Sequence, residues 1–122
     1  MKVTKGDFIY QQERPSTEVT YKSGDYVTAI YQDQWWLGLV EEGPDDDLMF
    51  LVDFLHPAGS MTSVSYNFPS PNRDKLLIHQ SDLLTRVHPS CPTGRSYVMS
   101  SGSRIDASNA LLRALREQTA LA

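Results

Sequence analysis

Three short segments of strand-forming residues, separated by turn-forming residues, most restrict how this chain can fold. They are residues 26–31, 35–42 and 48–55. Each is rich in β-branched and aromatic residues, which favour strands. The intervening stretches, 32–34 and 43–47, contain Gln and Asp, or Gly-Pro followed by three Asp, and such residues are typical of turns. Strands at this spacing predict a mainly β protein, built as a small antiparallel barrel or sandwich.

The C-terminal part of the chain has a different pattern. Residues 107–121 contain many good helix formers and few helix breakers, and Asp106 is suited to be the N-cap. Apolar and neutral residues recur there on one face at helical spacing. Fifteen residues are marginal for an isolated helix in water. We therefore expect the helix to pack on the barrel or to pair with another chain through residues 106–121.

The length of 122 residues suits one compact domain. We divide it into an N-terminal extension that adds edge strands (1–22), a barrel (23–88), an exit segment rich in Pro, Gly and Ser (89–105) and a helix (106–122). A single Cys allows no internal disulfide. The longest aliphatic and aromatic run, 48–52, is far too short to cross a bilayer. We expect an intracellular protein with no membrane partner.

Aromatic residues stand at one end of each of the three strands. Tyr31 ends the first, Trp36 is near the start of the second, and Phe54 is near the end of the third. Side chains alternate faces along a strand, and antiparallel connections bring these three ends to the same rim. The sequence therefore predicts that the three rings converge there. Trp35 has the opposite parity and should lie on the outer face, covered by the C-terminal helix or the N-terminal segment.

Three convergent rings can attract a poorly hydrated cation, such as a methylated ammonium or guanidinium group, through their quadrupoles. Additional ring walls and carboxylates are available in the sequence. The ring candidates are His56, Tyr66 and Phe68, and the acidic candidates are Asp33 and Asp53. The alternative is that the rings simply close the end of a small core.

The charge is unevenly distributed. Residues 1–60 carry four Lys and Arg against eleven Asp and Glu, a net charge of −7, whereas residues 61–122 carry seven against four, a net charge of +3. The aromatic strands lie mostly in the acidic half. An acidic field attracts basic segments and repels phosphate backbones.

Residues 24–31 and 35–40 resemble the first hairpin of Tudor domains. The resemblance begins at Gly24-Asp25, includes the aromatic ends at Tyr31 and Trp36, and continues through residues 50–54 to the Asp-Leu turn at 81–84. It covers residues 23–87, about half of the chain. It implies a five-stranded, bent, SH3-like barrel that binds methylated lysine or arginine in an aromatic cage. By position, Tyr31, Trp36 and Phe54 match three cage residues. The implied partner is a histone tail or an arginine-rich segment, and the implied location is the nucleus.

A second resemblance is to a domain of uncharacterised animal proteins associated with transposable elements. It rests on residues 25–36, 54–57 and 94–97. It implies a module of a larger polypeptide that acts near chromatin, and it implies no activity.

Other chemistry has little support in the sequence. His88 and Cys91 have metal-ligand spacing, but a structural zinc site needs four ligands and only His56 and His79 remain. Neither a nucleophile motif nor a phosphate-binding loop is present. We therefore expect no enzyme, no metal and no cofactor.

Two binding functions stay open beside methylated-peptide recognition. One is scaffolding or dimerisation without a methyl cage. The other, less favoured, is nucleic-acid binding through a separate basic strip. The strip would consist of Arg73, Lys75, Arg86, Arg95 and Arg104.

Overall fold

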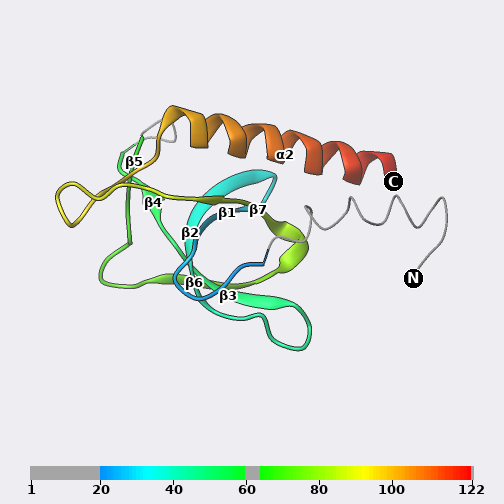
Figure 1. Cartoon of the computed structure of the whole chain (residues 1–122), viewed down its shortest axis with the longest axis horizontal. Coiled ribbons are helices and arrows are strands. Elements are labelled where there is room, and N and C mark those ends of the chain that lie inside the picture. The colour runs from blue at the N-terminus through cyan, green and yellow to red at the C-terminus, as the bar shows by residue number, and fades with distance from the viewer. Residues whose placement is uncertain (1–19, 60–63, 122) are drawn as a thin grey trace, which may run out of the picture.

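The computed structural model describes residues 20–59 and 64–121, the last four of these by their backbone alone (Figure 1). Its elements in chain order are β1 (Tyr26–Tyr31), β2 (Gln34–Glu42), β3 (Met49–Phe54), β4 (His56–Pro57), β5 (Ser65–Asn67), β6 (Asp74–His79), the 3₁₀ turn η2 (Gln80–Asp82), β7 (Leu83–Val87), β8 (Tyr97–Val98) and α2 (Ser101–Leu121). The three strands expected from the sequence are β1, β2 and β3.

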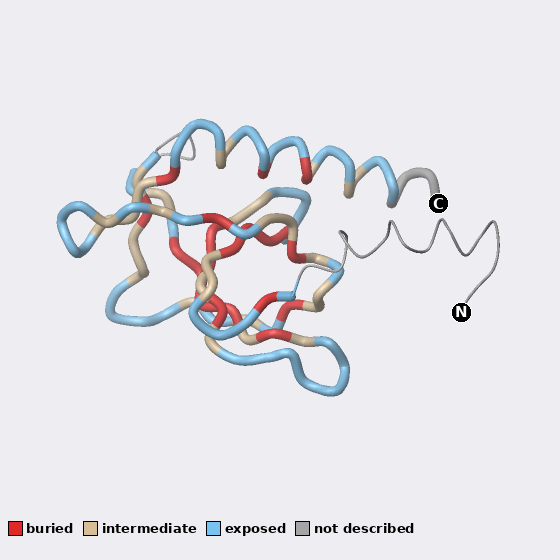
Figure 2. Tube along the Cα trace, viewed as in Figure 1, coloured by how far each residue is buried: buried red, intermediate tan, exposed pale blue. Residues whose placement is uncertain are grey.

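Five strands form one antiparallel sheet in the order β6-β3-β2-β1-β7. The sheet curls around its inner face, as Figure 1 shows. Alternate residues of each strand point inward and form the main core. Its buried members are Tyr21, Val27, Ala29, Val40, Phe50, Val52, Phe54, Ile78 and Leu83. Figure 2 shows this buried backbone at the centre of the molecule.

A second core lies on the opposite face of the sheet. The small antiparallel sheet β4-β5-β8 contributes to it, and α2 packs against β7 and β2. Its buried members are Leu37, Leu55, Tyr66, Val87 and Met99. Among the side chains of α2 that the structure describes, Ala107 and Ala110 are the buried ones, and Figure 2 shows the buried points of this helix on the side that faces the sheet. The small side chain of alanine lets the helix approach closely.

The fold class expected from the sequence is confirmed: the described residues form a mainly β protein with a C-terminal helix. The barrel is not closed, because no ladder among the described residues joins the edge strands β6 and β7, which are linked through η2. The edge strands expected in the N-terminal extension (1–22) fall outside the described residues up to position 19, and residues 20–22 form no strand. The exit segment contributes β8, which pairs with β5.

The helix begins earlier than the sequence predicted. We expected Asp106 as its N-cap, but α2 starts at Ser101 and Asp106 lies inside it. Ser100 holds the first turn instead: its Oγ accepts a hydrogen bond from the backbone N–H of Ser103 at 3.1 Å. Ser100, near the end of the expected exit segment, therefore caps the helix.

No helix of the described chain is long and apolar enough to cross a membrane.

Candidate functional site

The ends of β1 and β3 and the start of β2 surround an open pocket of about 580 Å³. We call it the rim pocket. Its ring and acidic walls are Tyr31, Trp36, Phe54, His56 and Asp74. The three rings that the sequence placed at one rim are thus brought together by the fold, and His56, an additional candidate, lies with them.

Strand register brings these rings together. Trp36 lies opposite Ala29 in the β1–β2 ladder, and Phe54 lies opposite Gly38 in the β2–β3 ladder. Both partners are small, so each large ring has room over its neighbour. The Trp36 indole N–H also donates to the backbone carbonyl of Tyr31 at 3.1 Å. This bond ties the indole to the end of β1 and orders the pocket wall before any ligand arrives.

The three rings differ in exposure. Phe54 is 3% exposed, so most of its ring belongs to the core and only its remaining surface lines the pocket. Tyr31 is 43% exposed. Trp36 is half-buried. The pocket therefore combines a ring held in the core with a ring that is open to solvent.

A carboxylate that the sequence did not single out also lines the rim pocket. Asp74 lies opposite Phe54 in the β3–β6 ladder, and its Oδ2 is 2.7 Å from His56 Nε2. The His56 ring in turn lies 6.4 Å from the Trp36 ring, centroid to centroid. The rim pocket therefore contains one carboxylate, hydrogen-bonded to His56, beside aromatic, aliphatic and amide-bearing walls.

The other expected wall residues lie elsewhere. Tyr66 is buried in the second core, and Phe68 packs against that core. Asp33 is exposed in the turn between β1 and β2, where its φ is 62°, and it does not line the pocket. None of these three residues lines the rim pocket. Parity within the first three strands does not determine where β5 lies or which way a turn residue points.

Asp53 is the second acidic candidate that the structure moves out of the pocket. It is fully buried, and Arg73 binds its Oδ2 through Nη2 at 2.7 Å and Nε at 3.0 Å. The guanidinium of Arg73 also lies 4.0 Å from the centre of the Phe68 ring. Asp53 is thus paired inside the protein and does not face a ligand.

Most of the basic strip considered for nucleic acid is paired with carboxylates. Arg73 binds Asp53, Lys75 binds Glu41 at 3.0 Å, and Arg86 binds Asp25 at 3.2 Å. The hydrogen bond from Lys75 lowers the pKa of the Glu41 carboxyl, which keeps that pair charged. These pairs leave less positive charge for a phosphate backbone than the sequence suggested.

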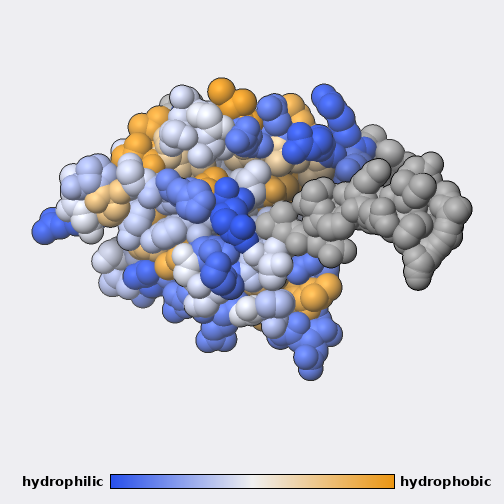
Figure 3. All heavy atoms as spheres, viewed as in Figure 1, coloured by the Kyte–Doolittle hydropathy of each residue, from blue (hydrophilic) through white to orange (hydrophobic). Residues whose placement is uncertain are grey.

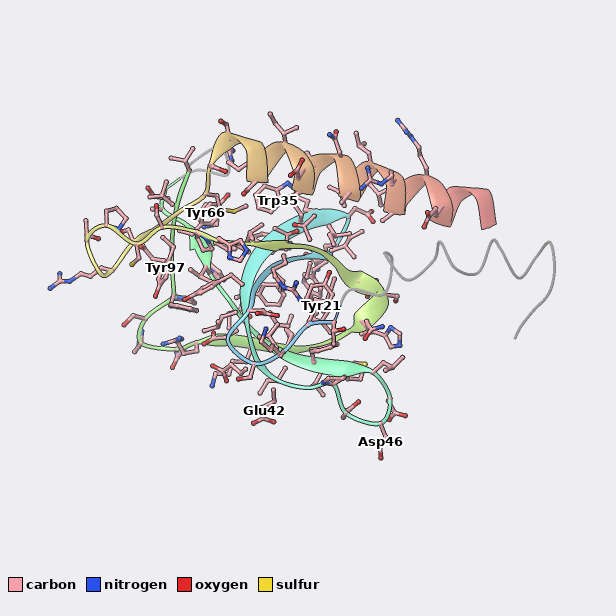
Figure 4. All side chains as sticks on the ribbon, in the orientation of Figure 1. Tyr21, Trp35, Glu42, Asp46, Tyr66 and Tyr97 are labelled. Carbon is pink, nitrogen blue, oxygen red and sulfur yellow. The ribbon has the colours of Figure 1, made fainter. Side chains whose placement is uncertain are left out.

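Trp35 lies on the outer face, as its parity predicted. Figure 4 shows it between the sheet and α2, where its indole N–H donates to Ser108 Oγ at 3.2 Å. A second pocket of about 630 Å³ lies there, between β2 and α2, and we call it the helix groove. Tyr66 also lines it. Burial raises the pKa of Tyr66, and the nearby Arg104 cation acts against that rise.

Among residues 20–59 and 64–121, no group of three or more His, Cys, Asp or Glu side chains is placed to hold a metal ion. Comparisons with protein-family models, with curated proteins and with solved structures found no match.

Proposed function

We propose that this chain is a non-catalytic binding module whose rim pocket takes a methylated lysine or arginine side chain of a basic segment, such as a histone tail. One observation carries the proposal. Tyr31, Trp36 and Phe54 come from three strands and line a single open pocket together with Asp74. An intracellular, nuclear location would suit such a partner.

The physical support is the match between this pocket and a poorly hydrated cation. A cation over an aromatic face gains roughly 0.5–2 kcal/mol, with the larger values where water is excluded. Methylation keeps the positive charge and weakens hydration, so a methylated cation loses less on leaving water. The carboxylate of Asp74 also attracts a cation to the pocket. The acidic half of the chain attracts a basic peptide over a longer range.

The competing interpretation is that the rings only close the core. Rings that close a core pack against one another without a gap. Here they surround an open volume, and Tyr31 keeps 43% of its surface exposed. An exposed tyrosine contributes little to a core, and this favours a binding role for it.

The test is an NMR titration of the full chain with peptides that carry mono-, di- or trimethylated lysine, or methylated arginine, beside the same peptides unmodified. We expect amide shifts around Tyr31, Trp36 and Phe54 with at least one methylated peptide and much weaker shifts with its unmodified form. Tyr31→Ala should abolish them. The matched control is Leu77→Ala, since Leu77 is 60% exposed and lies outside the pocket.

Absence of pocket shifts with every methylated peptide would contradict the proposal. Equal affinity for modified and unmodified peptides would contradict it as well. Charge attraction alone does not distinguish a methylated cation from an unmethylated one.

A further inference from the structure

The rim pocket and the helix groove share two wall residues, Trp36 and Pro57. The two cavities are therefore neighbours, separated by these side chains. We propose that the helix groove binds an apolar side chain of the same peptide whose methylated residue enters the rim pocket. This inference rests on the proposed function and adds to it a second specificity position.

The floor of the helix groove suits an apolar side chain. Trp35, Ile105 and Leu111 line it, the first from β2 and the other two from α2. Ile105 is 59% exposed although it borders a cavity. A side chain placed there would remove apolar surface of Ile105 from water, which is favourable in proportion to the area buried. Figure 3 shows hydrophobic residues along α2 among hydrophilic ones.

The edge of the groove suits a peptide backbone. Gln34 and Asn109 line it from opposite sides, one at the start of β2 and one on α2. Each side-chain amide offers both donors and an acceptor, so it can pair with the N–H and C=O groups of an extended chain. The polar edge and apolar floor together match one side chain with its flanking peptide bonds.

The charges of the two cavities differ. Asp74 lines the rim pocket, whereas Arg104 lines the helix groove. A second Lys or Arg of the peptide would therefore meet a like charge in the groove. We infer that the groove selects a neutral, apolar residue, and that the motif is one methylated cation with one apolar neighbour.

A short peptide can reach from the rim pocket to the helix groove. An extended chain advances about 3.3–3.6 Å per residue, and alternate side chains point to opposite sides. Because Trp36 and Pro57 border both cavities, the apolar residue should lie about one to three positions from the methylated one.

The test is isothermal titration of the full chain with two ligands. One is a methylated peptide that carries Leu at each of these neighbouring positions in turn, and the other is the blocked methylated amino acid alone. Ile105→Ser should weaken the best peptide about tenfold, the scale of one lost apolar contact, and leave the amino acid unchanged. Replacing that Leu with Lys should weaken wild-type binding at least as much.

The matched control is Leu112→Ser. Leu112 is also an exposed apolar residue of α2, at 49%, but it does not line the groove, so this change should leave both ligands unaffected. Serine is similar to isoleucine and only modestly poorer than leucine in helix propensity, so neither single change should unfold α2.

The outcomes separate this inference from the proposed function. If Tyr31→Ala weakens both ligands and Ile105→Ser weakens neither, the groove inference fails and the rim-pocket proposal stands. If no methylated ligand binds, the proposed function fails and the inference falls with it. If Ile105→Ser lowers the sedimentation mass of the free protein without changing peptide affinity, the groove holds a second copy of the chain and the inference is overturned.

Discussion

Phe54, which lines the rim pocket, packs across Gly38, its partner in the β2–β3 ladder. A Cβ atom at position 38 would lie 3.3 Å from Phe54 Cδ1 and would overlap Val52 Cγ1. We predict that Gly38→Ala destabilises the protein by about 1–3 kcal/mol, the usual cost of overpacking a filled core. Urea unfolding followed by tryptophan fluorescence measures this difference.

The matched control is Gly102→Ala, in the first turn of α2. The nearest atom to a Cβ there is Ser100 Oγ at 4.0 Å, so the methyl group has room. This change should be neutral or stabilise by up to about 1 kcal/mol, because alanine favours helix. Equal effects of the two substitutions would show that position 38 is not crowded.

Arg73 is expected to be required for stability because it pairs the buried carboxylate of Asp53. Arg73→Ala leaves that charge unpaired in the interior, and we predict a loss of about 3–5 kcal/mol in the free energy of unfolding. The stability of Arg73→Lys should lie between those of wild type and Arg73→Ala. One ammonium group cannot replace both N–H donors of the guanidinium or its stacking on Phe68. Denaturant midpoints of the three proteins measure the order.

The control for Arg73 is Arg95→Ala, an exposed arginine for which no carboxylate partner is seen in the described residues. It should change stability by less than about 0.5 kcal/mol, as surface substitutions generally do. A similar loss from both variants would mean that net charge, and not the buried pair, sets the effect.

The position of the helix N-cap is directly testable. Ser100→Ala removes the acceptor for the Ser103 N–H and should cost about 0.5–2 kcal/mol. Asp106→Ala should cost little, since Asp106 is an exposed residue inside α2. Thermal unfolding by circular dichroism compares them. The reverse order would restore Asp106 as the cap.

Tyr26 should make the protein sensitive to alkali. Burial, assisted by its hydrogen bond with Tyr97, raises the pKa of Tyr26 to about 12 from its ordinary value of 10.0. Below pH 10 this residue favours the folded state fully. As pH rises from 10 through 12, the unfolded chain releases the proton while the folded protein retains it, so the stabilisation is lost.

The Tyr26→Phe variant tests this assignment. It should lose less stability than wild type between pH 10 and 12, although part of the dependence should remain, because burial also raises the pKa of Tyr21 and Tyr66. In the folded variant, the tyrosinate absorbance should also lack the ionisation near pH 12 that Tyr26 contributes in wild type. An unchanged alkaline slope would mean that another group controls it.

The meeting of Tyr31, Trp36 and Phe54 could be predicted because it depends on short-range rules. Strand parity and a tight turn fix β1 against β2, and the next turn fixes β3. Asp74 could not be predicted in the same way. Its position opposite Phe54 depends on how β6 aligns on β3 after a long connection, and the length of that connection does not set the register.

The errors have a similar cause. Tyr66 belongs to β5, which pairs with β8 some thirty residues later, and neither strand is long enough to show a period. Asp53 lies in a strand whose alternation was recognised, but Arg73, far along the chain, pairs with its carboxylate. Sequence alone does not reveal such a pair. The early start of α2 was hidden because serine is a poor helix former but a good cap.

Trp35 and Trp36 are adjacent residues of β2 whose indoles serve opposite faces of the sheet. One bonds to Ser108 on α2, and the other bonds to the Tyr31 carbonyl. A slip of β2 by a single residue would exchange the two faces. Both hydrogen bonds and both cavities would be lost together, so β2 has one alignment in which the two indoles are accommodated. The two adjacent indoles therefore select one register of β2 against its neighbours.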